Sequence, residues 1–393
     1  MAKLIDITGK ALSGEWGKDD ETGEGIPVIR TTNFTNEGIV NYNNVVKRKI
    51  EKKNIEEKYL RKGDIIIEKS GGSDKFPVGR VVYFEGDENT YLFNNFTGLL
   101  RVKNQDVWYP KYVFYSLFSN YKRGGTRNFE NKTTGLHNLK IDDYVSRYEI
   151  SNINKEEQIY ICKKLDSLYG IIKSREMELQ LLDELVKARF VEMFGDPSNN
   201  EKKWTVNSFG EICKVRQGLQ IPISKRLTEY EEDCYEYITV QYLHGGKARE
   251  FIKNPNSSVI CSKDDILMTR TGNTGMVVTG VEGVFHNNFF LIDFDREKYN
   301  KIFLVHYLML DVIQADILRR AGTSTIPDLN HGEFYKIKVF EPPIELQNQF
   351  ADFVYQIDKS KLLAQIQLKN ITILLEICSI IYTNTNGNGE GTI

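Results

Sequence analysis

The segment GDIIIEKSGG at residues 63–72 is matched by DDILMTRTGN at residues 264–273, roughly half the chain further on. In each segment a short apolar run leads into a Lys or Arg, a hydroxyl side chain and a glycine. An apolar run of this length, bounded by glycine, predicts a buried strand that ends in a tight turn. Because the pattern occurs twice in 393 residues, it indicates an internal repeat with a period of about 200 residues.

Further pairs of segments keep the same order in both halves of the chain. Residues 111–121 and 302–320 carry apolar side chains at helical spacing, and a Gly-Thr-rich turn follows each of these helices. The other matching pairs are LIDI at 4–7 with FGEI at 209–212, GRVVYFEGD at 79–87 with GMVVTGVEG at 275–283, FNNF at 93–96 with FHNNF at 285–289, TTGLHNLKIDDY at 133–144 with STIPDLNHGEF at 324–334, and NKEEQ at 154–158 with PIELQ at 343–347. The shared order carries more weight than any single short motif.

Both halves end in a long helix, expected at about residues 155–194 and 345–382. Apolar side chains three and four residues apart run from Ile161 to Met193 in the first helix, and the second shows the same spacing. This is the spacing of a coiled-coil seam. A helix of about 40 residues is about 60 Å long, which is more than a small core can cover.

The sequence therefore predicts an α+β protein with a pseudo-twofold internal repeat. Two similar domains of mixed strands and helices are expected to be separated by two long antiparallel, coiled-coil-like helices. We expect the first domain at residues 1–150, the first spacer helix at 151–196, the second domain at 197–342, the second spacer helix at 343–383 and a disordered tail at 384–393.

The composition is that of a folded protein without a strong charge bias. Hydrophobic residues make up 40% of the chain and charged residues 27%, with a formal net charge of -2. These values exclude disordered and collagen-like classes but allow a local basic patch. The start of the chain lacks a signal-peptide core, and no apolar run approaches the roughly 18 residues of a membrane span, so we expect a cytoplasmic protein. The five cysteines have no C-x-x-C pair and are expected to be reduced, mostly buried and not bound to metal.

The segment LLDELVKARFVEMFGDP at residues 181–197 ends a heptad helix between the two copies, and it resembles the specificity subunits of type I restriction-modification systems. IPVIRTTNF at 26–34 and YEYITVQYL at 235–243 look like the family's early strand, and the repeated GDIIIEKSGG and DDILMTRTGN segments look like its second marker. Two features depart from the family's pattern. The first copy lacks a counterpart of Trp204, which leaves its opening strand undefined, and the acidic run at 229–236 is a poor candidate for DNA contact.

The resemblance implies a non-catalytic subunit with two target-recognition domains, each reading one half of a bipartite, asymmetric DNA target. It also implies that the paired helices set the gap between the halves and bind modification subunits, which use S-adenosylmethionine to methylate adenine. Restriction subunits, which consume ATP, would join through that complex. S-Adenosylmethionine, ATP and Mg²⁺ would then belong to the partner subunits, and this chain would hold no cofactor.

Basic and amide side chains gather near the turns of both domains, where they could enter a DNA groove or contact phosphates. Residues 122–140 are strongly basic, with Glu130 as the single acid, and form the expected DNA face of the first domain. Any one of these residues could instead be a solvated or capping residue of a turn. The residues expected to contact DNA are Arg30, Thr31, Asn33, Lys69, Ser70, Arg80, Lys122, Arg123, Arg127, Asn128 and Lys132 in the first domain, and Gln241, Arg270, Thr271, Asn273, Arg319, Arg320, Thr323 and Ser324 in the second.

The sequence shows no motif for catalysis on DNA. It has no G-x-x-x-x-G-K-[ST] loop for ATP and no N-P-P-Y or D-P-P-Y run of an adenine methyltransferase, and its five histidines are not paired at metal spacing. We therefore expect no catalytic residue in this chain. The alternative that stays open is a self-sufficient restriction or modification enzyme, or a fragment of one, with an unrecognised active site.

Overall fold

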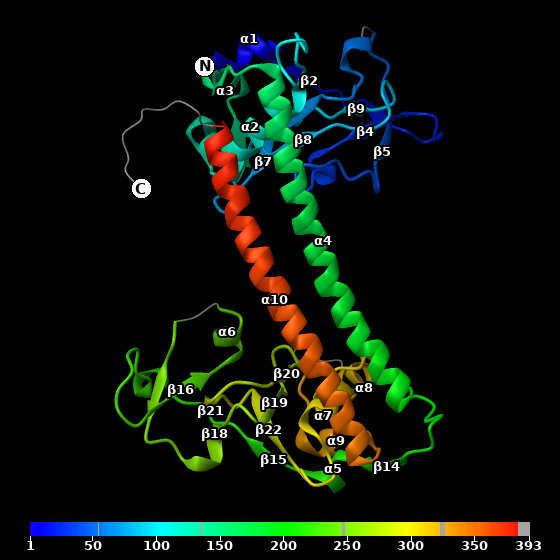
Figure 1. Cartoon of the computed structure of the whole chain (residues 1–393), viewed down its shortest axis with the longest axis vertical. Coiled ribbons are helices and arrows are strands. Elements are labelled where there is room, and N and C mark those ends of the chain that lie inside the picture. Colours follow the sequence, from blue (N-terminus) through cyan, green and yellow to red (C-terminus); the bar gives the residue numbers. More distant parts are fainter. Residues whose placement is uncertain (54, 134–135, 246–247, 323–326, 384–393) are drawn as a thin grey trace. The chain divides into compact units, whose positions relative to one another are not determined.

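The computed structural model describes residues 1–53, 55–133, 136–245, 248–322 and 327–383 (Figure 1). The chain divides into two compact units. Unit 1 consists of Met1–Arg175 with Gln367–Ile393, and unit 2 consists of Glu176–Ile366. The helices α4 (Lys155–Phe194) and α10 (Ile344–Thr383) each contribute one part to both units.

Unit 1 is built on two four-stranded sheets and one three-stranded sheet. The strand orders are β2 (Leu12–Ser13), β10 (Thr97–Leu100), β6 (Ile65–Glu68) and β8 (Val81–Tyr83) in the first; β3 (Lys18–Asp19), β5 (Val46–Lys49), β4 (Ile26–Ile29) and β9 (Leu92–Phe93) in the second; and β11 (Glu130–Thr133), β12 (Leu136–Leu139) and β7 (Ser70–Gly72) in the third. A further pair, β1 (Ala2–Lys3) with β13 (Glu149–Ile150), joins the two ends of the domain. The helices α1 (Leu4–Thr8), α2 (Pro110–Lys122) and α3 (Ile141–Arg147) complete it.

Strand β6 lies between two hydrophobic cores. Ile65 and Ile67 pack in the core that contains α2, whereas Ile66 packs in the core that contains Phe84 and Phe93. Successive side chains of a strand point to opposite faces, so β6 is covered on both of them. This explains why the GDIIIEKSGG segment is continuously apolar and does not alternate with polar residues.

Unit 2 repeats this plan. One four-stranded sheet corresponds to the sheet around β6 and has the order β15 (Cys213–Gln217), β22 (Phe289–Phe294), β19 (Ile266–Thr269) and β20 (Val277–Val278). A second sheet, whose strands lie between β15 and β22 in the sequence, has the order β17 (Phe251–Lys253), β16 (Cys234–Ile238), β21 (Gly283–Phe285) and β18 (Ile260–Cys261). Strand β14 (Thr205–Ser208) pairs with β23 (Lys338–Glu341), as β1 pairs with β13. The helices are α5 (Phe209–Ile212), α6 (Val240–Leu243), α7 (Lys301–Leu308), α8 (Asp311–Ala321) and α9 (His331–Tyr335). The predicted α+β fold with an internal repeat is therefore confirmed.

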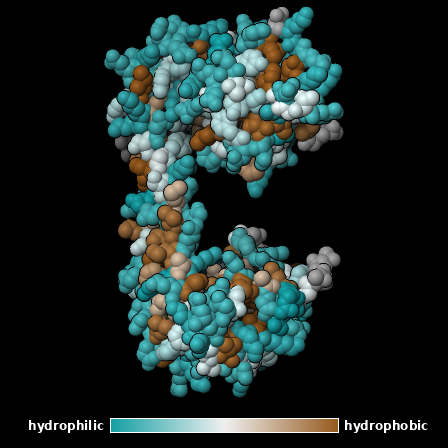
Figure 2. Space-filling view, turned by 90° about the vertical axis from the view of Figure 1, so that its right-hand side faces the viewer, coloured by the Kyte–Doolittle hydropathy of each residue, from teal (hydrophilic) through white to brown (hydrophobic). Residues whose placement is uncertain are grey.

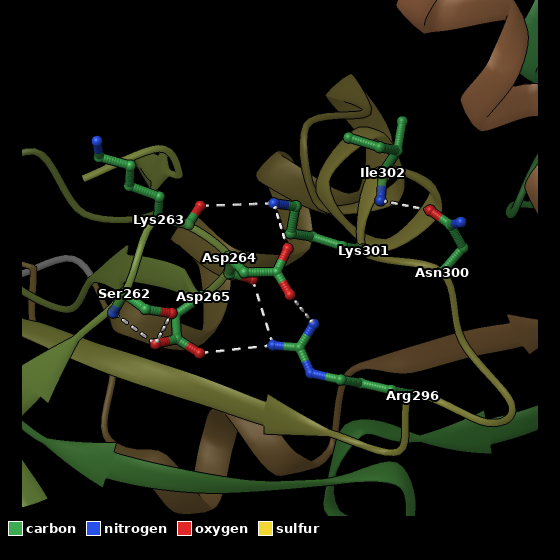
Figure 3. Close-up of polar contacts among 8 residues, drawn as sticks. All are labelled: Ser262, Lys263, Asp264, Asp265, Arg296, Asn300, Lys301 and Ile302. Carbon is green, nitrogen blue, oxygen red and sulfur yellow. Dashed lines mark hydrogen bonds and ion pairs between the residues drawn. The ribbon is translucent and has the colours of Figure 1, made fainter. Parts of the chain in front are cut away.

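An aspartate fixes the turn before the marker strand in both units. Asp64 accepts a hydrogen bond from the Arg61 N–H (2.7 Å), and Asp265 accepts one from the Ser262 N–H (2.8 Å). An arginine from the strand end binds at each turn: Arg101 donates to the Asp64 carboxylate (2.7 and 2.6 Å). In unit 2 the corresponding arginine, Arg296, donates mainly to the neighbouring Asp264, and Lys301 at the start of α7 donates to the same carboxylate (Figure 3). The aspartate in GDIII and DDILM is thus a structural residue.

A buried glutamine explains the repeated EEQ and ELQ segments. Gln158 accepts a hydrogen bond from the Tyr109 N–H (2.8 Å) and donates to the carbonyls of Val107 and Ile153 (3.0 and 2.9 Å). Gln347 makes the equivalent set: it accepts from the Asn300 N–H (2.8 Å) and donates to two carbonyls, those of Lys298 and Pro342. Tyr109 and Asn300 directly precede α2 and α7. Each glutamine therefore ties the start of a long helix to its own domain.

The two long helices begin and end where the heptad pattern predicts, within one residue. In unit 1, Ile161 and Leu165 of α4 share a core with Leu375 near the end of α10. In unit 2, Phe190 and Phe194 near the end of α4 pack against Phe350 near the start of α10. The two helices therefore run antiparallel in each unit.

Three sequence expectations about local structure need correction. Residues 302–320 form two helices, because the backbone at Leu310 is extended (φ -63°, ψ 138°), and Gln314 takes up the freed Leu308 carbonyl (2.7 Å). Within the segment expected as a turn from residue 133, Leu136–Leu139 form strand β12, which pairs antiparallel with β11 and has Asn138 as the register partner of Asn131; residues 134–135 lie outside the described residues. The opening strand of the first domain exists as β1, although it has no tryptophan before it.

Helix α10 also differs from the expectation that no segment could span a membrane. Its residues Ile344–Ser379 include a stretch long and apolar enough for a span by length and composition alone, and only 11% of that stretch is buried. One such helix is weak evidence of a membrane location. Exposed apolar side chains on the two helices include Met177, Leu181, Leu185, Leu362, Leu363 and Ile366. Figure 2 shows hydrophobic residues (brown) at the surface of the long helices.

The five cysteines are free thiols, as predicted. Four are buried, and Cys378 is half-buried. Burial raises the pKa of Cys162 and of Cys213 to about 12, so both remain protonated at neutral pH. The residues that the structure describes contain no group of three or more His, Cys, Asp or Glu side chains that could hold a metal ion.

Candidate nucleic-acid interface

The three-stranded sheet of unit 1 brings two predicted segments together. Strand β7 follows Lys69, and its Ser70 is the register partner of Asn138 on β12, which in turn faces Asn131 on β11. The Lys69 carbonyl accepts a hydrogen bond from the Leu139 N–H (2.8 Å). The second marker and the basic stretch at 122–140 are therefore one surface, although they lie far apart in the sequence.

The basic stretch begins where α2 ends and winds into the 3-10 helix Gly125–Phe129. Gly124 has a left-handed backbone (φ +75°), which reverses the chain after the helix. Arg123 and Arg127 are exposed, and each also donates to backbone carbonyls: Arg123 to Ser119 (3.3 Å), and Arg127 to Asp74 (3.1 Å) and Lys75 (3.3 Å). Lys122 lies over the Phe118 ring at 5.3 Å, and burial lowers the pKa of its ammonium group. Asn128 is exposed, and the Lys132 side chain lies outside the described residues.

The buried side chains of Glu130 and His137 support this surface from inside the domain. The Glu130 carboxylate accepts from the Val78 N–H (2.9 Å) and lies 3.0 Å from Nδ1 of the buried His137. Nε2 of His137 lies 3.6 Å from the Asp74 carboxylate. In the sequence, Glu130 stands out only as the single acid of a basic stretch, and Asp74 and His137 were missed. The presence of one acid in that stretch was the signal that it has a structural partner.

The early-strand residues of unit 1 are largely held by internal contacts. Asn33 is buried and donates to the carbonyls of Asn41 (3.0 Å) and Asn43 (3.3 Å), and its side-chain oxygen accepts from the Arg30 N–H. Arg80 donates to the Thr31 carbonyl (2.8 Å) and lies 3.6 Å from the buried Glu68 carboxylate. Burial raises the pKa of Glu68. These contacts give Asn33 and Arg80 a positioning role, whereas Arg30 and Thr31 remain partly exposed.

Lys69 and Arg270 occupy equivalent places in the two units. The Lys69 N–H donates to the Phe96 carbonyl (2.8 Å), and the Arg270 N–H donates to the Asn288 carbonyl (2.7 Å). The Lys69 ammonium group donates to the Ser13 hydroxyl (2.7 Å), and burial lowers its pKa. The Arg270 guanidinium forms a forked pair with the Asp328 carboxylate (2.9 and 2.7 Å), which raises the pKa of Arg270. Both side chains are half-buried at the end of the marker strand.

The other predicted residues of unit 2 are less closely gathered. Thr271 donates to the Asn288 side chain (3.1 Å), and the exposed Asn273 has a left-handed backbone (φ 96°) in the same turn. Arg319 and Arg320 of α8 both bind Asp316, and Arg320 also lies 3.3 Å from Glu333. Gln241 is exposed on α6. Thr323 and Ser324 lie outside the described residues.

The type I restriction modification DNA specificity domain matches the chain twice, at residues 2–183 and 201–372. The chain belongs to this family. The two matched segments cover most of the chain, and each contains one β-rich domain and part of one long helix. The resemblance seen in the sequence is therefore confirmed for the family.

Known members of the family resemble the chain in sequence and in fold. The type I restriction enzyme MjaVIII specificity subunit of Methanocaldococcus jannaschii is 26% identical over 156 residues, which is 39% of this chain and 36% of that protein. The crystal structure of the S subunit of a type I restriction-modification system from M. genitalium has a TM-score of 0.59 at 17% identity, covering 98% of this chain and 96% of that one. A solved structure from work on complex assembly and conformational transition of the type I R-M system has the same TM-score at 14% identity, covering 97% of this chain and 96% of that one. At these identities the structural likeness establishes the fold.

Proposed function

We propose that this chain is the DNA sequence-specificity subunit of a type I restriction-modification complex and that each domain reads one half of a bipartite, asymmetric target. The observation that carries this proposal is the duplicated site. In both units a basic residue, Lys69 or Arg270, follows the buried marker strand at the same backbone position. Two copies of one reader that differ in their exposed side chains suit two different half-sites.

The division of labour within a domain follows from exposure. The exposed groups, such as Arg123, Arg127 and Asn128, face solvent and can reach phosphates or base edges. The buried side chains, such as those of Asn33 and Glu130, hold the turns that carry the exposed groups. The residues predicted from the sequence stay candidates for DNA contact, except Asn33 and Arg80, which we assign to positioning that surface.

The paired helices are the proposed docking surface for modification subunits, and restriction subunits would join through that complex. Exposed apolar side chains on both helices, among them Leu181 and Leu362, support this assignment. Large apolar side chains that gather on an exposed surface are typical of a subunit interface. S-Adenosylmethionine, ATP and Mg²⁺ would be held by those partners, and this chain would perform no catalysis. We place the complex in the cytoplasm with its DNA substrate.

Two experiments test the proposal. Methylome sequencing of a host that expresses the chain with its modification subunits should show one bipartite adenine-methylation motif that is absent without the chain. Incubation of the pure chain with DNA and S-adenosylmethionine should give neither methyl transfer nor cleavage. Activity of the isolated chain would instead favour a self-sufficient enzyme.

A further inference from the structure

The turn at residues 73–77 is an insertion that only unit 1 carries at this place. Lys69 and Arg270 are equivalent, and Gly79 precedes β8 as Gly275 precedes β20. Residues 70–78 connect these points in unit 1, whereas residues 271–274 are sufficient in unit 2. The extra residues, Ser-Asp-Lys-Phe-Pro, place Phe76 with 60% of its surface exposed.

Hydrogen bonds close the inserted turn and tie it to the basic stretch. The Ser73 N–H donates to the Phe76 carbonyl (2.7 Å), and the Phe76 N–H donates to the Ser73 hydroxyl (3.1 Å). Arg127 donates to the carbonyls of Asp74 and Lys75, so the exposed part of the turn is braced from the basic stretch. Pro77 restricts the backbone of Phe76 to extended conformations. Because the backbone that carries the ring is held in this way, less entropy is lost when the ring meets a ligand.

The surroundings of the ring suit a polyanion with flat apolar groups. The ammonium group of Lys75 lies 5.3 Å from the ring centre, and the exposed Arg127 and Asn128 follow on the same basic stretch. A duplex offers phosphates for these cations and base faces for the ring. A single exposed phenylalanine is ordinary on a protein surface, but a braced one beside cations on an inserted turn has the features of a wedge.

We propose that Phe76 inserts between two neighbouring base pairs of the half-site that unit 1 reads, unstacking that step and bending the duplex. This inference rests on the proposed function. A phenyl ring offers no hydrogen bond to a base edge, so it would select sequence through deformability, favouring flexible pyrimidine–purine steps at its position. Unit 2, which lacks the insertion, would leave its own half-site stacked.

The test uses the full chain assembled with its modification subunits and a duplex that carries the target found by methylation mapping. 2-Aminopurine, whose fluorescence rises on unstacking, replaces single bases at successive positions of both half-sites, and fluorescence anisotropy gives the affinity. We compare Phe76→Ala with Phe76→Trp, which keeps an aromatic wedge, and with Ile39→Ala, which removes a similarly exposed apolar side chain of the same unit. Circular dichroism checks that the variants are folded.

The expected result is an unstacking signal in one half-site that Phe76→Ala abolishes, with about tenfold weaker binding, as for the loss of one base–aromatic stack. Phe76→Trp should keep the signal, and Ile39→Ala should change neither quantity. Any unstacking caused by the modification subunits would persist in Phe76→Ala and is thereby separated. Tight binding with no signal that depends on Phe76 overturns the wedge, including the case in which the ring only touches a thymine methyl group. Failure of the wild-type complex to bind the mapped duplex would instead count against the proposed function.

Discussion

Arg270 is held by a carboxylate that a DNA phosphate could replace. Its forked pair with Asp328 lies just after β19 and is partly exposed, and Asp328 is the main cause of the raised pKa of Arg270. Arg270 in turn lowers the pKa of Asp328. The ion pair is therefore fully formed at pH values above the usual pKa of an aspartate and is lost only as the pH falls through the lowered pKa. At neutral pH, Asp328 is therefore ionised and, under the proposed function, would compete with DNA for this guanidinium.

We predict that Asp328→Asn tightens DNA binding about two- to fivefold at low salt, because it frees a cation and removes a negative charge. The plot of log affinity against log salt should steepen by about one. Asp264→Asn is the matched control: it makes the same charge change in the Arg296 and Lys301 network before β19, at the other end of that strand (Figure 3). Equal effects of the two variants would mean that the domain's overall charge, and not Arg270, is responsible.

Gln158 offers a second test at this scale. Replacing it with alanine leaves the Tyr109 N–H and the carbonyls of Val107 and Ile153 without their partner in a fully buried site. We predict a loss of about 1–3 kcal/mol in the free energy of unfolding, measured by urea denaturation. Gln180→Ala removes only an exposed contact to Glu184 and should stay within about 0.5 kcal/mol. A Gln158→Ala loss no larger than that of the control would refute the structural role.

Long-range polar partners were beyond the sequence. Gln158 is recognisable as a repeated letter, but two of its three partners, Tyr109 and Val107, lie 49 and 51 residues back in the chain, and no local pattern names them. The same holds for Asp74 and His137, which meet only because β7 pairs with β12. The DNA-contact residues stay a prediction from charge and turn position. Which of them are exposed, such as Arg127, and which are held by internal contacts, such as Asn33, needed the tertiary structure.

At the scale of elements, continuous periodicity was the reliable signal. Helices α4 and α10 were predicted nearly to the residue because 40 residues of heptad spacing have few alternative interpretations. The break between α7 and α8 was missed because residues 309–310, Met-Leu, are good helix formers. Gln314 decides it by binding the Leu308 and Gly275 carbonyls, a contact with a turn far away in the sequence.

The exposed apolar side chains of these helices give a prediction about assembly. Changing Leu181 and Leu362 to serine should reduce co-purification of modification subunits at least about tenfold, since large apolar anchors dominate such interfaces. Both side chains are mostly exposed in this chain, so its thermal stability should hardly change. Ile223→Ser serves as the control, because Ile223 is an exposed apolar residue outside α4 and α10. Full recovery of partners by the double variant would place the docking surface elsewhere.

At the scale of the whole molecule, the repeat gives the long helices their proposed meaning as a ruler between two readers. Inserting four helix-forming residues between Leu168 and Leu179 of α4 adds about 6 Å and turns the C-terminal remainder of the helix by about 40°. Two more base pairs advance a duplex by about 7 Å and turn it by about 70°, which is close enough for both readers to engage. A seven-residue insertion keeps the heptad seam and adds about 10 Å, but it turns the chain by about -20° where three base pairs turn DNA by about 100°.

We therefore predict that the four-residue variant methylates the same two half-sites with a gap longer by one or two base pairs, as read by methylome sequencing. The seven-residue variant should bind every spacer poorly, although its seam is intact. Either insertion shifts the pairing with α10 in unit 1, where Leu375 shares a core with Leu165, so some stability should be lost in both. Because both variants are expected to lose stability, each serves as the control for the other, and a difference in DNA binding between them reports the rotation of the readers on the duplex. An unchanged gap at normal activity in the four-residue variant would show that α4 does not set the spacing.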